Sequence, residues 1–110
     1  MNILKALTIV VMAAACGITG AQAADVEAGH KKVKEVCAAC HGEDGNGIMP
    51  DYPKLAGQHR DYLAKALRDY KSGLRKNPIM AGMAGPLTRE DIDNVAAYYG
   101  SRPALLSSHF

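Results

Sequence analysis

The residues most able to do chemistry in this chain are two cysteines and a histidine within five positions. They form a C-x-x-C-H run from Cys37 to His41. Cysteines at this spacing on one helical turn can each form a thioether bond to a vinyl group of the same porphyrin. The histidine that follows can then place a ring nitrogen on the haem iron. The motif predicts one covalently attached haem c, with Cys37 and Cys40 as the attachment points and His41 as an axial ligand.

Two other interpretations start from the same cysteine pair. A redox disulfide of the C-x-x-C type accompanies a βαβ pattern, and the sequence shows no convincing strand. A structural zinc site needs four ligands, but neither Cys16 nor the remaining histidines form a second pair at motif spacing. Those histidines are His30, His59 and His109. Haem attachment is therefore the prediction, and zinc binding and thiol redox chemistry are its alternatives.

The first 23 residues have the pattern of an export signal. Lys5 precedes an apolar run, and small residues lead to Ala21-Gln22-Ala23, an A-x-A cleavage pattern. We expect cleavage after Ala23 and a periplasmic location for the mature chain. Two alternatives stay open, since an uncleaved segment could anchor the chain in a membrane and Cys16 could be lipidated. Cleavage would leave only the two cysteines of the motif.

Size and charge narrow the class of protein. The chain has 110 residues, which indicates one domain. Without Lys5, 12 of the 13 basic residues remain against 11 acidic ones, a net charge of +1. This balance, with no basic run among aromatic residues, argues against nucleic-acid binding. So small a chain buries little core, and a covalently held haem would help to stabilise it.

Helical periodicity and end signals predict three helices, over residues 25–39, 59–72 and 88–100. Glycine and proline mark 42–57 and 74–86 as the loops between them. The second loop carries two methionines. An all-α chain is therefore expected.

Two features predict how these helices begin and cross. Gly29 lies one turn before Val33, and its missing Cβ would let another helix approach closely. Thr88 is followed three residues later by Asp91, an acidic variant of the capping box. We expect a tight crossing at Gly29 and a capped helix start at Thr88.

In this order of features the chain resembles a class I cytochrome c. The features are a helix, C-x-x-C-H, a Pro-x-Leu loop, a helix, a methionine loop and a last helix with adjacent tyrosines. Residues 52–58 and 92–99 particularly resemble the small bacterial cytochromes of the c-553 and c4 group. The resemblance implies three to four helices wrapped around one haem, in a domain over 24–103. Residues 1–23 would be the signal peptide and 104–110 a C-terminal tail.

The resemblance also implies roles for single residues. The carbonyl of Pro53, twelve residues after His41, is expected to accept the imidazole N–H and so orient the ring. Met80 is expected to be the second axial ligand of the iron, with Met83 as the fallback, whereas Met49 is expected to pack.

Further positions follow from the same resemblance. The first helix is expected to cross the last through Gly29 and Val33, against Val95 and Tyr98 or Tyr99. Four residues are candidates for contact with the haem propionates: Tyr52, Gln58, Arg75 and Lys76.

The function implied by the resemblance is single-electron transfer in a respiratory chain. With both axial sites filled, no position is open for a substrate, so we expect a carrier and not an enzyme. Its partners would be redox proteins: membrane cytochrome complexes, terminal oxidases or periplasmic dehydrogenases, met in small transient contacts. Membrane contact would be peripheral or through an uncleaved N-terminus. The alternatives are a haem-bearing subunit of a periplasmic oxidoreductase, and a peroxidase or gas sensor with a labile distal methionine.

Overall fold

The structure, a computed structural model, describes residues 23–105. Its helices, in chain order, are α1 (Val26–Lys32), the π-helical segment η1 (Val33–Cys37), α2 (Ala38–His41), α3 (Arg60–Ser72), α4 (Pro78–Ala84) and α5 (Arg89–Gly100). The described residues contain no strand, so the expected all-α class is confirmed. The predicted signal sequence, apart from Ala23, and the tail beyond Leu105 lie outside the described residues. No helix between 23 and 105 is long and apolar enough to cross a membrane.

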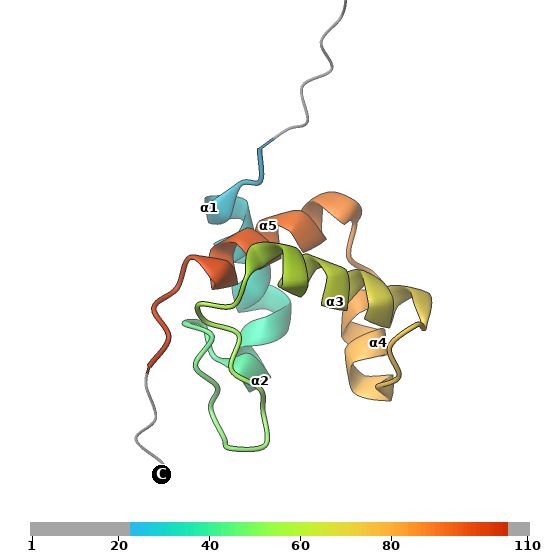
Figure 1. Ribbon diagram of the computed structural model, residues 1–110, viewed down its shortest axis with the longest axis horizontal. Helices are drawn as coiled ribbons and strands as arrows, with labels where there is room; N and C mark the ends of the chain where they lie inside the picture. The colour runs from blue at the N-terminus through green and yellow to red at the C-terminus, as the bar shows by residue number, and fades with distance from the viewer. Residues whose placement is uncertain (1–22, 106–110) are drawn as a thin grey trace, which may run out of the picture.

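Three helices build the centre of the molecule. Helix α5 packs against both α1 and α3, and α4 packs on α3. Figure 1 shows α2 and α4 projecting from the same side of α3, well apart from each other. The buried core lies where α1, α3 and α5 meet, and its members are Val33, Leu63, Ala64, Leu87, Ile92, Val95, Ala96, Tyr98 and Tyr99.

The crossing of α1 and α5 depends on the glycine that the sequence indicated. A Cβ on Gly29 would lie 2.0 Å from the carbonyl oxygen of Asn94 and 3.1 Å from Cβ of Tyr98. Since neither backbone has room to move apart cheaply, only glycine allows this approach. Val33, one turn on, is fully buried. The predicted crossing is confirmed, with Asn94 as an additional partner.

The first helix is longer than predicted and irregular. Helical backbone continues from α1 through η1 and α2 to His41, past the expected end near residue 39. Within it, the N–H of Ala38 donates to the carbonyl of Val33, five residues earlier, as in a π-helix. The sequence did not predict this turn. A single π turn alters the backbone hydrogen bonds, and no particular residue type marks its position.

The starts and ends of α3 and α5 agree with their sequence signals. Gly73 ends α3 in the left-handed conformation, with φ 84°. At the start of α5, Asp91 N–H donates to Thr88 Oγ1 over 3.0 Å, and Thr88 N–H donates to Asp91 Oδ2 over 3.0 Å. The predicted capping box is therefore present.

Helix α4 corrects the expectation that residues 74–86 form only a loop. The side chain of Asn77 accepts hydrogen bonds from the backbone N–H groups of Ile79 and Met80, over 3.0 and 3.1 Å. Pro78 follows at the first helical position, where its missing N–H costs nothing. The Asn-Pro pair was thus a helix start, which the nearby glycines obscured.

Candidate functional site

The two cysteines of the motif lie on consecutive helical segments. Cys37 ends η1 and Cys40 lies in α2; both are half-buried and neither is in a disulfide. Burial raises the pKa of the Cys37 thiol to about 11, against the opposing influence of Lys32. This thiol therefore ionises less readily than an ordinary cysteine, which argues against a nucleophilic role.

A zinc site also lacks further ligands. Within residues 23–105, no three side chains of the types His, Cys, Asp and Glu are grouped so that they could hold a metal ion. The zinc alternative therefore has no support in this part of the chain.

His41 is fixed in orientation by the loop that follows it. The side chain is 8% exposed, and its Nδ1 lies 2.8 Å from the carbonyl oxygen of Pro53. Because a carbonyl can only accept, Nδ1 carries the proton, and Nε2 is left as the unprotonated nitrogen that can bind a metal. The contact expected from the resemblance is thus present, and it fixes the orientation of the ring.

The chain can return to His41 because α2 stops abruptly. Gly42 has φ 79°, a conformation that side chains rarely adopt, and it ends the helix directly after His41. Further on, the N–H groups of Leu55 and Ala56 donate to the carbonyl of Gly45 over 2.7 and 2.9 Å. The loop is closed on itself and brings Pro53 back to the imidazole.

Two tyrosine hydroxyls of α5 hold the start of this loop. The Tyr99 hydroxyl donates to the carbonyl of Gly42 over 2.9 Å, and the Tyr98 hydroxyl donates to the carbonyl of Glu43 over 2.8 Å. The His30 ring stacks on the Tyr98 ring at 4.6 Å, and its Nε2 lies 2.6 Å from Oε1 of Glu43. The residues just after His41 are therefore bonded directly to the core helix.

Sequence reasoning predicted apolar packing for these tyrosines and missed their hydroxyl contacts. The signal was the residue type, since a buried tyrosine usually finds a partner for its hydroxyl. Burial raises the pKa of Tyr99, so its hydroxyl remains a donor at neutral pH. Asn94 was missed as well: it is buried in α5, and its Oδ1 accepts the N–H of Asp25 over 2.7 Å. A single amide in an apolar stripe was the available signal there.

The candidate methionines differ in how far the chain encloses them. Met80, in the middle of α4, is half-buried, whereas Met83 is 47% exposed and Met49 is 53% exposed. The described residues therefore do not bury Met49, which was expected to pack. Met80 and Met83 both belong to α4, which stands apart from the helix of His41.

The residues present fit a covalently attached haem. Two unpaired thiols precede an imidazole whose Nε2 is free to bind metal, and thioether sulfurs lie on a second segment. Among the described residues, five of the eight large apolar side chains that are exposed lie either between His41 and α3 or between α3 and α5: Ile48, Met49, Leu74, Ile79 and Met83. A porphyrin is an apolar disc that would cover such side chains, and a bare metal ion would not.

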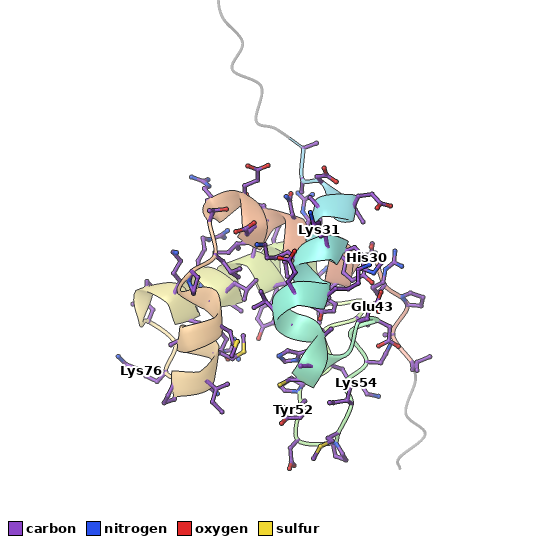
Figure 2. The ribbon with its side chains drawn as sticks, turned by 180° about the vertical axis from the view of Figure 1, so that it is seen from behind. His30, Lys31, Glu43, Tyr52, Lys54 and Lys76 are labelled. Carbon is purple, nitrogen blue, oxygen red and sulfur yellow. The ribbon has the colours of Figure 1, made fainter. Side chains whose placement is uncertain are left out.

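The candidate propionate partners lie on separate segments of the chain, Tyr52 and Gln58 before α3 and Arg75 and Lys76 after it. Arg75 Nη1 donates to the Tyr62 hydroxyl over 3.3 Å, and its guanidinium lies 4.9 Å from the centre of the Tyr70 ring. Figure 2 shows Tyr52 beside the end of α2 and Lys76 on the far side of α4.

Comparison with known proteins identifies the family to which this fold and motif belong. The family model for cytochrome c matches residues 26–101, and the chain belongs to the cytochrome c family. Haem c is its covalently attached cofactor, and Cys37 and Cys40 fit the C-x-x-C-H attachment motif.

Individual relatives point to one branch of the family. The chain is 48% identical over 82 residues to cytochrome c4 of Thiocapsa roseopersicina, which covers 74% of this chain and 42% of that protein. The crystal structure of reduced recombinant cytochrome c4 from Pseudomonas stutzeri aligns with a TM-score of 0.71 and 44% identity, over 76% of this chain and 48% of that one. A protein of Stutzerimonas stutzeri named thiosulfate dehydrogenase electron acceptor is 41% identical, over 76% of this chain and 42% of its own length. The chain thus spans about half the length of these relatives.

Proposed function

We propose that this chain is a periplasmic monohaem electron carrier whose haem iron is bound by His41 and Met80. The observation that carries the proposal is the fixed imidazole: Nδ1 of His41 donates to Pro53, so Nε2 is held ready for iron next to two thiols at attachment spacing. Met80 is the preferred distal ligand because it is the more enclosed methionine of α4. Met83 is the fallback.

The haem supplies a one-electron Fe(II)/Fe(III) couple when bound. Cys37 and Cys40 would hold it at two points, and His41 is kept in one tautomer and one orientation by Pro53. The thioether of Met80 would raise the potential relative to a second imidazole. With His41 and Met80 both bound to the iron, no coordination site would be left for a substrate, and the chain would transfer electrons without catalysing a reaction.

The partners we propose are other redox proteins. The relative named thiosulfate dehydrogenase electron acceptor supports a periplasmic dehydrogenase as the electron donor. The same relative favours a second candidate function, in which the chain is a dedicated haem subunit of such an enzyme. Isolation from the native membrane and periplasm distinguishes the two, since a dedicated subunit purifies with a stoichiometric partner and a free carrier does not.

We also propose the boundaries of the mature protein. Cleavage after Ala23 would leave a cytochrome domain over 24–103, which agrees with the family match over 26–101, followed by a tail over 104–110. Intact mass and N-terminal sequencing of the exported protein test this. A retained or lipidated N-terminus would contradict it.

Absorption spectra of the oxidised and reduced protein, with CO added to the reduced form, test the proposed function. We expect a c-type spectrum with the methionine-to-ferric-iron charge-transfer band and no response to CO. A high-spin spectrum or rapid CO binding would instead support a peroxidase or gas sensor. A preparation without haem would contradict the proposal from its first step.

A further inference from the structure

The segment that carries Met80 has few connections to the rest of the molecule. Helix α4 has seven residues, and a helix this short is not stable alone in water. It packs on α3, and only Ala84 is buried within it, with Leu87 buried just beyond. The position of Met80 therefore depends on the contacts that hold α4 against α3.

One side chain provides the polar part of that attachment. Lys71 lies in the last turn of α3, and its Nζ donates to the carbonyl oxygens of Gly85 and Leu87, each over 2.6 Å. Across residues 23–105, these are the only hydrogen bonds between the segment 76–87 and another part of the chain.

A lysine ammonium is well suited to bind the C-terminal end of a helix. The last carbonyls of a helix lack partners within the helix and carry partial negative charge. An ammonium group has three donors and can bond the Gly85 carbonyl at this helix end together with the Leu87 carbonyl beyond it. Gly85 directly follows α4, so Lys71 binds the C-terminal end of the helix while Asn77 caps its start. Both ends of the Met80 helix are therefore closed, and only the Lys71 end is tied to α3.

We propose that Lys71 is a positioning residue for the distal haem ligand. By holding α4 on α3, it keeps the Met80 sulfur in place on the iron, and loss of the ammonium raises the rate at which Met80 dissociates. This inference rests on the proposed function, in which Met80 is the axial ligand.

The test compares three lysine variants of the haem-loaded protein. K71M keeps most of the side-chain stem but removes the donors. K71R keeps a charged donor. K31M removes one charge elsewhere, at an exposed lysine of α1 with no hydrogen bond or ion pair in the described structure. The readout is the rate of imidazole binding to the ferric protein in stopped-flow absorption, because imidazole enters only after Met80 leaves.

We expect imidazole to bind about tenfold faster to K71M than to wild type, as for the loss of a charge-assisted hydrogen bond. K71R should restore most of the wild-type rate, and K31M should match wild type. Equal rates for K71M and K31M would overturn the inference. If K71M does not accumulate, K71Q replaces it with an intermediate rate expected, and a wild-type rate for K71Q would overturn the inference equally.

The charge-transfer band separates this inference from the proposed function. If the wild-type protein lacks the methionine-to-iron band, the assignment of Met80 fails and the role of Lys71 fails with it. If wild type shows the band and K71M binds imidazole at the wild-type rate, only the role of Lys71 fails. Chemical denaturation of each variant serves as the control, since a merely structural role would lower global stability without selectively raising the imidazole rate.

Discussion

The segments of the two proposed axial ligands are held in the structure by different means. The residues after His41 are bonded to hydroxyls of Tyr98 and Tyr99, which belong to the buried core helix α5. The Met80 helix is bonded through Lys71, whose side chain lies at the surface of α3. One ligand segment is therefore attached to buried side chains of the core, and the other to an exposed side chain on the surface of α3.

This difference indicates which ligand can leave without unfolding the protein. Local opening occurs where few apolar contacts are buried and where the backbone bonds are exposed. The α4 segment meets both conditions, whereas displacement of the residues just after His41 would break their hydrogen bonds to buried tyrosines of α5. We therefore expect the α4 segment, which carries Met80, to open first under heat, denaturant or competing ligand.

The largest expected difference in the free energy of unfolding is between two glycine substitutions, one in α1 and one in α4. Gly29→Ala would place a Cβ 2.0 Å from the carbonyl oxygen of Asn94, so we expect a loss of about 3 kcal/mol in the free energy of unfolding. Gly82→Ala in α4 has no atom within 4 Å of the new Cβ and should gain about 0.5–1 kcal/mol from helix propensity. Guanidinium denaturation of both proteins measures this. Equal effects would show that the α1–α5 crossing is looser than the structure indicates.

Removal of the Met80 sulfur tests directly whether Met80 is the distal ligand. Met80→Ala should keep the haem attached but open the sixth site, so that CO binds. The potential should fall by a fraction of the roughly 0.8 V that axial ligands span. Spectroscopy and potentiometry measure both changes, with Met83→Ala as the matched control. A normal charge-transfer band in Met80→Ala, together with its loss in Met83→Ala, would transfer the assignment to Met83.

Loss of a tyrosine hydroxyl tests how the residues just after His41 are held. Tyr99→Phe leaves the carbonyl of Gly42 without its buried donor and should cost about 2 kcal/mol. Tyr98→Phe should cost about 1 kcal/mol, because its bond to Glu43 is less buried. Denaturation at neutral pH measures both losses, and a cost for Tyr98→Phe as large as that for Tyr99→Phe would contradict the ranking by burial.

The same tyrosine predicts a pH dependence. Burial raises the pKa of Tyr99 in the folded state, so the unfolded chain releases this proton first as pH rises. Wild-type stability should therefore decline above pH ~10, near the ordinary pKa of tyrosine. Tyr99→Phe should lack this part of the decline. Parallel denaturation curves from pH 9 to 11 measure the difference, and identical slopes for the two proteins would be inconsistent with a buried Tyr99 hydroxyl.

The smallest expected effect concerns an exposed carboxylate in the loop after His41. Hydrogen bonds from Asn46, chiefly from its backbone N–H, lower the pKa of Asp44. The contribution of Asp44 to stability is thus present above the ordinary carboxyl pKa and is lost as pH falls through its lowered value. Asp44→Ala should be slightly less stable than wild type at pH 7, and the two should converge at pH 2. A difference that persists at pH 2 would not be electrostatic.

Local sequence signals predicted much of this fold. The capping box at Thr88 and the glycine at the end of α3 each depend on neighbouring residues, so they could be identified in the chain itself. The crossing at Gly29 was also predictable, because a glycine on the apolar face of a helix permits an approach that a Cβ would block. The C-x-x-C-H motif predicted the cofactor because its chemistry lies within five consecutive residues.

The parts that could not be predicted depend on contacts distant in sequence. Lys71 bonds backbone carbonyls 14 and 16 residues away, and Tyr99 bonds one 57 residues away. Backbone carbonyls are the same at every position, so such partners leave no pattern in the sequence. Helix α4 is a different case, since its Asn-Pro start was local but was outweighed by the nearby glycines.

The π turn at Val33–Cys37 sets the rotational phase between two parts of one helix. Gly29 lies before it and faces α5, Cys37 is its last residue, and Cys40 and His41 follow it. A wide turn adds a residue without adding a turn, so it shifts the later side chains around the helix axis. Deleting one residue there would restore regular winding and rotate His41 by about 100° away from Pro53, the angle of one α-helical residue. The length of this short segment is therefore as constrained as the identity of the haem-binding residues it orients.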